Sequence, residues 1–453
     1  MKSRITSVSL LFASVSSLAG TVSVPDGAEL STLLARDELT NYMCRITGRI
    51  DACPDTVIGT VKTLGDRIPS AAAKALAKTD NIEASWTGFD GRTLWIVGKN
   101  EVAELYATYH FLESKLGVRW FQAKTKEDPG DYVPKMERVV LQKFSEFREP
   151  TFRIRRLELM RAFGNLPATN AQTCAVRNGF QVRPPYSRIN YERPNEANTR
   201  FYAPRVPHKL TMLGGDHGTF ASTCPAKTWF ATHPEYFALV DGKRKSGQQY
   251  CISNPGLRHA VVDRILAALD RDGGNGEWVF GMVDTTYGWC ECVACRALDD
   301  PEASKSINPN VSRRFMLTVK DISEKVWKKR PDANLHMWAY HTYRRRAKDV
   351  THDPRMKICF CDHGRCYGHA LDDPTCEKNV RILGMLKEWM ASGHHVYVYA
   401  YLLCSNPTYA CNEIIQADDI RKYVKLGVMG WKEEGVFSDS RFVDQKALYL
   451  RDI

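Results

Sequence analysis

The stretch SRRFMLTVKDISEKVWKKRPDANLHMWAY, residues 312–340, predicts an amphipathic helix followed by a short buried strand. The first 18 residues, 312–329, have the apolar spacing of a helix, and 334–340 is an apolar run of strand length. Units of this kind recur throughout the chain after residue 150. Repeated strand-then-helix units favour parallel strands, and their number favours a (β/α) barrel.

Seven strands are predicted after residue 150, at 152–159, 208–213, 277–283, 334–340, 356–361, 395–401 and 428–432. Helices are predicted between them at 255–270, 312–329, 377–391 and 416–426. An open doubly wound sheet is the alternative, but neither GxGxxG nor GxxxxGK[ST] occurs to support a nucleotide-binding version. The expected fold is therefore α/β, a (β/α)8-like TIM barrel that is incomplete at its C-terminal end. Either the sequence is truncated, or the N-terminal portion or a partner supplies the eighth strand.

A length of 453 residues is comfortable for a barrel plus a smaller domain. Leu94 to Gly98 predicts a buried strand, 101–116 a helix capped by Gly117, and 118–121 the next strand. We therefore expect a signal peptide at 1–19, a small α/β domain at 20–145 and the barrel at 146–453.

The first 19 residues have the pattern of a secretory signal. Lys2 and Arg4 give a positive start, 8–15 is a short apolar run, and small residues precede the predicted cleavage after Ala19. The run is too short to span a bilayer, and Thr21 stands where a lipoprotein would have cysteine. A secreted or periplasmic protein, with no membrane anchor after cleavage, is expected.

The net charge of +11 falls to +9 when Lys2 and Arg4 leave with the signal. Most of this excess lies in residues 148–205, which hold eleven arginines and four glutamates but no lysine or aspartate. Prolines interrupt the segment, which argues against a basic recognition helix, and no nucleic-acid partner is predicted. Arginine without lysine indicates fork-like bonds to carboxylates, either in an anionic or polyhydroxylated ligand or in ordinary internal ion pairs.

Catalytic groups of a barrel lie at the carboxyl ends of its strands. Two carboxylates, Asp284 and one of Glu433 or Glu434, are predicted there, as glycoside hydrolysis requires. Polar and aromatic side chains near the same strand ends are predicted to bind a carbohydrate: His217, Trp289, Tyr340, His341, Tyr401, Trp431 and Glu433. Core or rim packing is the alternative for each aromatic residue. The pair His394-His395 is expected on the surface.

The run CECVAC, residues 290–295, contains the CxxC spacing of a metal site, with a fourth ligand from Cys359, Cys361 or a histidine. No second CxxC occurs, and export favours oxidised cysteines, so disulfides are preferred over a structural metal or redox chemistry. A disulfide between Cys366 and Cys376 could close the loop between them. The disulfide candidates are Cys290, Cys292, Cys295, Cys366 and Cys376, and neither a metal nor a cofactor is predicted.

The runs HPEYFALVDGKR (233–244) and QYCISNP (249–255) resemble a bacterial exported family of unknown function that has been linked to glycoside hydrolase family 163. Further matches are Asp284 with CECVAC, the run DDPTCEKN (372–379), Tyr399-Ala400-Tyr401 and Glu434-Gly435. The first domain resembles the α/β domain that precedes the barrel in α-glucuronidases and β-hexosaminidases. Val283 and Ala400 depart from the family pattern, which has Asn and an acid at these positions.

The resemblance implies an endo-β-N-acetylglucosaminidase acting on N-glycans. We expect a retaining mechanism in which the 2-acetamido group of the sugar can act as internal nucleophile, with Glu434 as general acid and Asp284 as the second carboxylate. The roles could be reversed. A catalytically silent carbohydrate-binding protein on the same scaffold and an α-glucuronidase-like hydrolase remain the alternatives.

Overall fold

The computed structural model describes residues 20–158, 168–181, 212–271, 276–300, 310–401 and 413–434. The chain divides into two compact units. The first comprises Met1–Val118 and Val133–Arg148, and the second comprises Arg119–Tyr132 and Glu149–Ile453. None of the described helices combines the length and the apolar character that a membrane span requires.

The first unit is a five-stranded mixed sheet in the order β1-β2-β4-β3-β7. Its strands are β1 (Val22–Ser23), β2 (Asp55–Thr60), β3 (Ser85–Phe89), β4 (Thr93–Gly98) and β7 (Phe144–Arg148). The first three in this order are parallel, whereas β3 is antiparallel to both of its neighbours. The predicted strand at Leu94 is thus the central strand of the sheet.

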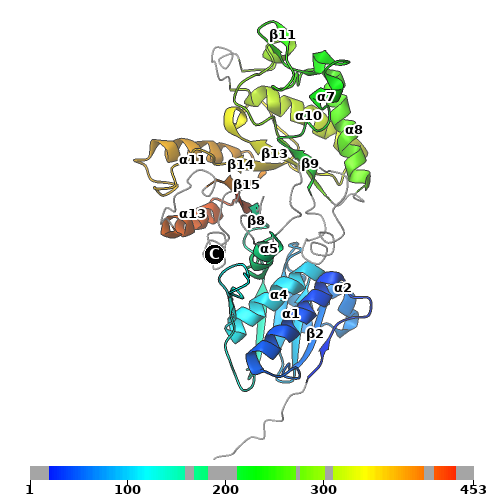
Figure 1. The fold of residues 1–453 in the computed structure, drawn as a ribbon, viewed down its shortest axis with the longest axis vertical. Coiled ribbons are helices and arrows are strands. Elements are labelled where there is room, and N and C mark those ends of the chain that lie inside the picture. Colours follow the sequence, from blue (N-terminus) through cyan, green and yellow to red (C-terminus); the bar gives the residue numbers. More distant parts are fainter. Residues whose placement is uncertain are drawn as a thin grey trace, which may run out of the picture. The chain divides into compact units, whose positions relative to one another are not determined.

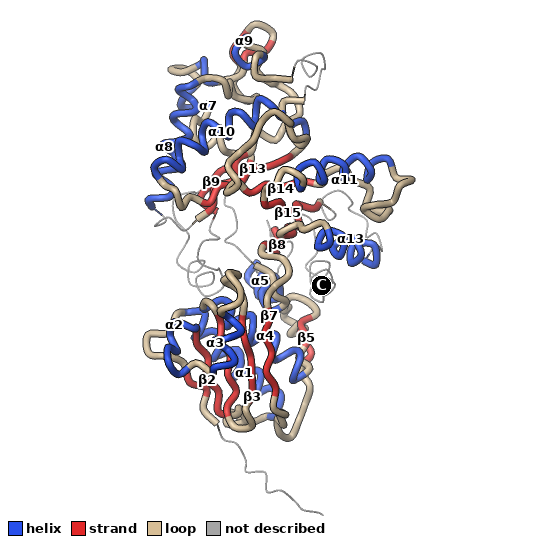
Figure 2. The backbone as a smooth tube through the Cα atoms, turned by 180° about the vertical axis from the view of Figure 1, so that it is seen from behind, coloured by secondary structure: helices blue, strands red, loops and turns tan. Residues whose placement is uncertain are grey.

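Helices cover both faces of this sheet (Figures 1 and 2). The long helices α1 (Leu30–Thr47) and α4 (Glu101–Leu116) contact each other, and α4 also packs on β4. The short helices α2 (Val61–Leu64) and α3 (Ser70–Leu76) pack through Leu64, Ala72 and Leu76 against Trp86 and Val97. Both long helices end at a glycine with positive φ, Gly48 and Gly117, as expected for the second from its sequence.

The second unit contains a seven-stranded sheet in the order β8-β16-β15-β14-β13-β12-β9, and every neighbouring pair in it is parallel. Its strands are β8 (Ile154–Glu158), β9 (Met212–Asp216), β12 (Glu277–Phe280), β13 (Asn334–Ala339), β14 (Lys357–Cys361), β15 (His395–Ala400) and β16 (Gly430–Glu434). The expected α/β class is confirmed, as an incomplete TIM-like barrel.

The expected gap between the last and first strands is not there, because β16 pairs with β8 from Gly430↔Ile154 to Glu434↔Glu158. The interruption lies instead on the other edge of β8, where Gln181 forms an isolated parallel bridge with Arg156. Its backbone N–H donates to the carbonyl of Arg155 at 2.7 Å. Residue 181 therefore occupies the position of a second strand in chain order, and β16 takes the eighth position.

Helices lie between the strands of the second unit: α5 (Ala168–Arg177), α7 (Ala226–Trp229), α8 (Pro255–Arg271), α9 (Val293–Arg296), α10 (Ser312–Lys329), α11 (Glu377–Met390) and α13 (Glu413–Lys425). Two hairpins complete it, β5 (Arg119–Trp120) with β6 (Asp131–Tyr132) and β10 (Leu239–Val240) with β11 (Lys243–Arg244). Helices α8 and α10 contact each other and flank the sheet together (Figure 1).

Several boundaries differ from those expected. Strand β9 begins at Met212, while most of the predicted 208–213 falls outside the described residues. Gly215 in β9 has a φ of 99°, and a Cβ there would lie 1.9 Å from the carbonyl oxygen of Val279 on β12. Only glycine permits this close pairing, so the strand lacks the branched side chains by which strands are recognised. Strand β16 includes Glu433 and Glu434, which were expected to follow it.

Polar side chains tie the barrel strands together from inside. Arg156 on β8 donates from both terminal nitrogens to Glu277 on β12, at 2.5 and 3.0 Å, and both side chains are at most 5% exposed. His336 on β13 lies 3.7 Å from the same carboxylate and forms a 3.0 Å hydrogen bond with the Tyr397 hydroxyl. At least one member of the arginine-rich segment thus makes an internal fork-like ion pair.

Candidate active site

Asp284 lies just beyond the carboxyl end of β12, where the chain leaves the barrel strand. Its side chain is 58% exposed. The hydroxyl of Tyr340 donates to its Oδ1 at 3.4 Å, and Nε2 of His217 lies 3.7 Å from the same oxygen. The structure therefore brings together three predicted site residues that come from the ends of β9, β12 and β13.

The orientation of His217 is fixed by the backbone. Its Nδ1 lies 3.0 Å from the carbonyl oxygen of Met282, and a carbonyl can only accept, so Nδ1 carries the hydrogen. The ring also packs edge-on against Trp338, with centroids 4.4 Å apart, and against Tyr340. Nε2 is thereby directed towards Asp284, and it can donate to that carboxylate only when the ring is protonated.

Four aromatic rings form a continuous group beside this carboxylate. Trp338 and Tyr340 are two residues apart at the end of β13, and Tyr399 and Tyr401 are two residues apart at the end of β15. Because side chains alternate along a strand, the two members of each pair lie on the same face. Tyr340 and Tyr401 are stacked at 6.1 Å with an interplanar angle of 14°. Trp338 contacts Tyr399 edge-on. All four are buried, with at most 7% of each residue exposed.

Two histidines extend the site. His341 has a φ of 45°, a left-handed conformation that is uncommon and strained for a residue other than glycine. Its ring lies 4.0 Å from Tyr340 and 4.7 Å from His363, between centroids. Burial, and then the neighbouring His363, lower the pKa of His341 to about 4, and burial also lowers the pKa of His363. Both rings are therefore neutral at pH 7 and can exchange hydrogen bonds with hydroxyl groups.

We call His217, Asp284, Tyr340, His341, His363 and Tyr401 the mouth cluster. His363 was not among the predicted site residues. Lys432 was missed altogether: its Nζ lies 3.8 Å from the centroid of the Tyr399 ring and 5.9 Å from that of Trp338. Lys432 pairs with Tyr399 in the sheet register, and paired residues on neighbouring strands point to the same face. The position of Tyr399 was therefore the signal that could have found Lys432.

The predicted residues of β16 do not all join the mouth cluster. Trp431 and Glu433 are buried on the face of β16 opposite to Lys432, because side chains alternate along a strand. Glu434 is the last residue of β16 and pairs with Glu158 at the carboxyl end of the barrel. Its carboxylate lies outside the described side chains.

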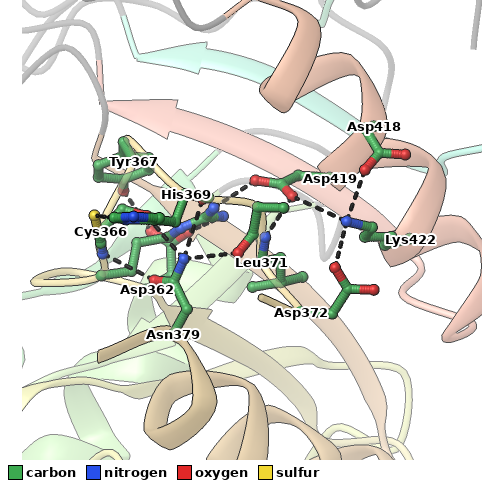
Figure 3. A network of polar contacts seen from close by, with 12 residues as sticks. Asp362, Cys366, Tyr367, His369, Leu371, Asp372, Asn379, Asp418, Asp419 and Lys422 are labelled. Atoms are coloured by element: carbon green, nitrogen blue, oxygen red, sulfur yellow. Dashed lines mark hydrogen bonds and ion pairs between the residues drawn. The ribbon is translucent and has the colours of Figure 1, made fainter. Parts of the chain in front are cut away.

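Asp362 follows β14, as a catalytic acid would, but its carboxylate is fully engaged (Figure 3). It accepts from the hydroxyls of Tyr367 at 2.8 Å and Tyr423 at 3.3 Å, and Arg365 lies 3.7 Å away. Burial raises its pKa, while Arg365 opposes this. The Tyr367 hydroxyl in turn accepts from the N–H of Tyr401 at 2.7 Å. This network supports the backbone on which Tyr401 stands, so Asp362 positions the site.

The loop that carries Asp284 is held by Gln249, which sequence reasoning did not select although it begins the run QYCISNP. The Gln249 amide donates to the carbonyls of Val283 at 2.8 Å and Thr285 at 3.2 Å, on either side of Asp284. Gln249 is fully buried. Trp289, a predicted sugar-binding residue on the same loop, is also buried and packs edge-on against Tyr343.

The described cysteines are present as free thiols. The predicted disulfide candidates fall into two groups. Cys290, Cys292 and Cys295 gather with Cys251, and Cys366 and Cys376 gather with His369. Cys251, which was not among the candidates, comes from the run QYCISNP. The ligands considered for the first group, Cys359 and Cys361, lie in β14 instead.

Comparison with solved structures shows glycoside hydrolases with the same fold. A GH138 enzyme targeting pectin rhamnogalacturonan II aligns with a TM-score of 0.50 and 9% identity, over 95% of this chain and 50% of its own. The β-N-acetylhexosaminidase from Bacteroides fragilis aligns with a TM-score of 0.51 and 10% identity, over 96% of this chain and 86% of its own. The chain thus spans half the length of the first of these proteins.

At these identities the likeness concerns the fold, an N-terminal α/β domain followed by a TIM-like barrel. The comparison with curated proteins gives no match. One family model matches residues 128–451, most of the chain, and it is described as a domain of unknown function, DUF4838. The chain therefore belongs to the DUF4838 family.

Proposed function

We propose that the protein is a retaining glycoside hydrolase that cleaves β-N-acetylglucosaminyl linkages in N-glycan-like substrates. The observation that carries the proposal is the mouth cluster, in which Asp284 meets Tyr340 and His217 beside buried aromatic rings. Aromatic faces with a few directed polar groups are the usual composition of a sugar site. The resemblance to glycoside hydrolase family 163 and the fold shared with hexosaminidase-type enzymes support the same substrate class.

In this proposal Asp284 acts as the carboxylate that orients the 2-acetamido group of the sugar. Its Oδ1 accepts a hydrogen bond from the Tyr340 hydroxyl. A carboxylate can accept several hydrogen bonds, so the N–H of the acetamido group can also donate to it. The acetamido oxygen then attacks the anomeric carbon while an acid protonates the departing oxygen. Glu434, at the carboxyl end of β16, is the proposed acid. The role of Tyr340 is to hold the Asp284 carboxylate in one orientation, and a protonated His217 would add a second donor to it.

The first test is hydrolysis of N-glycans and aryl N-acetylglucosaminides by wild type, Asp284→Asn and Glu434→Gln. We expect each substitution to lower kcat by at least about 100-fold, the contribution of a positioned acid or base. Asp263→Asn is the control, because Asp263 is an exposed acid of α8, 3.4 Å from His259, outside the site. Activity unchanged in both site variants would remove the assignment.

Substrate-assisted chemistry makes a second demand, since the nucleophile belongs to the sugar. Aryl N-acetylglucosaminides should be cleaved, whereas aryl glucosides, which lack the acetamido group, should not. Hydrolysis of both at similar rates would exclude acetamido participation. Aryl glucuronides form the third arm of this assay, and preferential cleavage of these would favour the α-glucuronidase-like alternative.

A catalytically silent carbohydrate-binding protein is the second candidate. The mouth cluster supports it, because the neutral rings of His341 and His363 can exchange hydrogen bonds with sugar hydroxyls without a pair of carboxylates. A glycan array separates the two functions. Binding of glycans by wild type that is weakened in Tyr340→Ala, with no turnover of any glycoside, would favour the binding protein over the hydrolase.

We also propose that the protein is exported, with residues 1–19 as a cleaved signal. The positive start, the short apolar run and the small residues before Gly20 support this. Expression in a bacterial host and N-terminal sequencing of the protein from the periplasm or medium should give a chain beginning at Gly20. Recovery from the cytoplasm with Lys2 and Arg4 still attached would contradict it.

A further inference from the structure

We propose that Cys251, Cys290, Cys292 and Cys295 form a structural zinc site that joins two loops of the barrel. We call these residues the four-cysteine cluster. Cys251 precedes α8 in the long loop after β9, and the other three come from the loop after β12. Their four Sγ atoms lie within 4.8 Å of one another, although almost forty residues separate the first from the second.

The distances match those of a tetrahedral site. Zinc–sulfur bonds of about 2.3 Å at tetrahedral angles place two sulfurs about 3.8 Å apart. The Sγ atom of Cys251 lies 3.6 Å from that of Cys292 and 3.8 Å from that of Cys295. A disulfide requires about 2.05 Å between two sulfurs and pairs them two by two. Here one sulfur, that of Cys251, is close to two others at once, as in a shared coordination sphere.

The surroundings of the sulfurs suit thiolates. The N–H of Leu239 donates to Cys290 at 3.3 Å, and the N–H of Cys295 donates to Cys292 at 3.4 Å. A guanidinium nitrogen of Arg244 lies 3.7 Å from the Cys290 sulfur. Four thiolates around one Zn²⁺ carry a net charge of −2, so these donors and this cation offset charge that would otherwise be buried.

The apolar cluster directly around the sulfurs is small. Cys251, Cys290 and Cys295 are at most 3% exposed. Among the residues that the structure describes, Ala238 is the further buried member of their apolar cluster, with Leu239 and Val240 packed beside it. So small an apolar core supplies little hydrophobic stabilisation. A structural metal is a usual substitute where a core of this size must hold long loops.

The site has a consequence for the candidate active site. Gln249, two residues before Cys251, holds the backbone on both sides of Asp284, and Asp284 lies six residues before Cys290. The four-cysteine cluster therefore closes a ring of contacts around the Asp284 loop. Zinc would fix the position of this loop without contacting substrate, which makes the cysteines positioning residues.

The experiment is metal analysis of the full chain, purified without chelator from medium containing zinc. We expect about one zinc per chain in wild type and loss of that zinc in Cys251→Ser and Cys295→Ser. Cys44→Ser is the matched control, because Cys44 is a free cysteine of α1 outside both thiol groups, and it should keep the zinc of wild type. Retention of the zinc by both cluster variants, or iron in its place, would overturn the proposal.

Two measurements on wild type remain decisive if the variants fail to fold. Replacement of zinc by Co²⁺ should give the intense visible absorption of tetrahedral thiolate coordination. Alkylation without reductant should leave the four cysteines protected in the metal-loaded protein and modify them after chelation alone. Modification that requires a reductant instead would identify two disulfides, and free thiols with no cobalt spectrum would show that no metal binds; either result overturns the proposal.

Discussion

Glu104 shows how a single buried carboxyl can couple the stability of the protein to pH. It lies in α4 with no exposed surface, and its Oε2 accepts from the hydroxyl of Thr32 in α1 at 2.6 Å. Burial raises the pKa of Glu104 to about 8, although the Thr32 hydroxyl opposes this. The folded protein therefore holds a proton that the unfolded chain releases near its ordinary pKa of about 4.3.

The stability should therefore fall as the pH rises from about 4.5 to about 8, because the folded state binds more protons than the unfolded state in this range. Glu104→Gln removes the titration and keeps an acceptor for Thr32. We expect it to raise the free energy of unfolding at pH 8 by about 1–3 kcal/mol and to have little effect at pH 4.5. Urea unfolding at the two pH values measures the difference.

The matched control is Glu137→Gln, the same substitution at an exposed position of the first unit. It should change the stability equally, and little, at both pH values. An effect of Glu104→Gln that is the same at pH 4.5 and pH 8 would show that Glu104 does not hold its proton in the folded state.

Single residues were also the least predictable part of the site. The strand ends that carry Asp284 and Tyr340 could be predicted, because apolar runs fix where strands are. The side chains that face the barrel interior could not be predicted, because an error of one residue along a strand reverses the face. Trp431 was predicted in the site, but it is the next residue, Lys432, that lies over the ring of Tyr399. His394 was expected on the surface but is buried.

At the scale of elements, the side chain of Asn379 in α11 binds the loop after β14 (Figure 3). Its Oδ1 accepts from the N–H of Cys366 at 2.9 Å, and its Nδ2 donates to the carbonyls of Cys366 at 2.9 Å, Ala370 at 2.9 Å and His369 at 3.1 Å. Asn379 is fully buried. Asn379, the last residue of the run DDPTCEKN, thus stabilises the conformation of the loop.

Asn379→Leu keeps the approximate volume but leaves buried backbone groups of this loop without their partner. We expect it to lower the free energy of unfolding by about 2–4 kcal/mol, since each unsatisfied buried group costs about 1–3 kcal/mol. Lys378→Leu, an exposed substitution in the same turn of α11, should change it by less than about 0.5 kcal/mol. Equal melting temperatures for the two variants would contradict the role of Asn379.

Elements were predicted best where the helical pattern was long. Helices α10 and α4 have the predicted bounds, whereas α5 was missed and β9 was misplaced. Strand β9 contains Gly214 and Gly215 in place of the branched side chains that signal a strand. Glycine is required at these positions because β12 lies too close for a Cβ atom. Such a requirement depends on a partner far away in the sequence, so local periodicity does not reveal it.

At the scale of the second unit, closure of the barrel depends on which strands meet. The sequence pattern indicated seven strands and therefore a gap before the first. The structure pairs β16 with β8 and, within the described part of the chain, places Gln181 in an isolated bridge at the other edge of β8. The seven predicted strands match the seven of the described sheet. The bridge at Gln181 was not predicted, because a single paired residue has no periodicity that a sequence pattern could reveal.

The ion pair between Arg156 and Glu277 tests this closure, because it joins β8 to β12 through the barrel interior. Glu277→Gln removes the buried carboxylate that both terminal nitrogens of Arg156 contact, so we expect it to lower the free energy of unfolding by about 3–5 kcal/mol. Replacing both residues with apolar ones, Arg156→Met with Glu277→Leu, should cost much less than the two single substitutions together, since neither charge of the pair remains buried without the other.

Asp353→Asn is the control: its pair with Arg355 is partly exposed and should contribute about 0–1 kcal/mol. Urea unfolding of the single and double variants measures these costs, and equal effects of Glu277→Gln and Asp353→Asn would show that the interior pair does not hold the strands together.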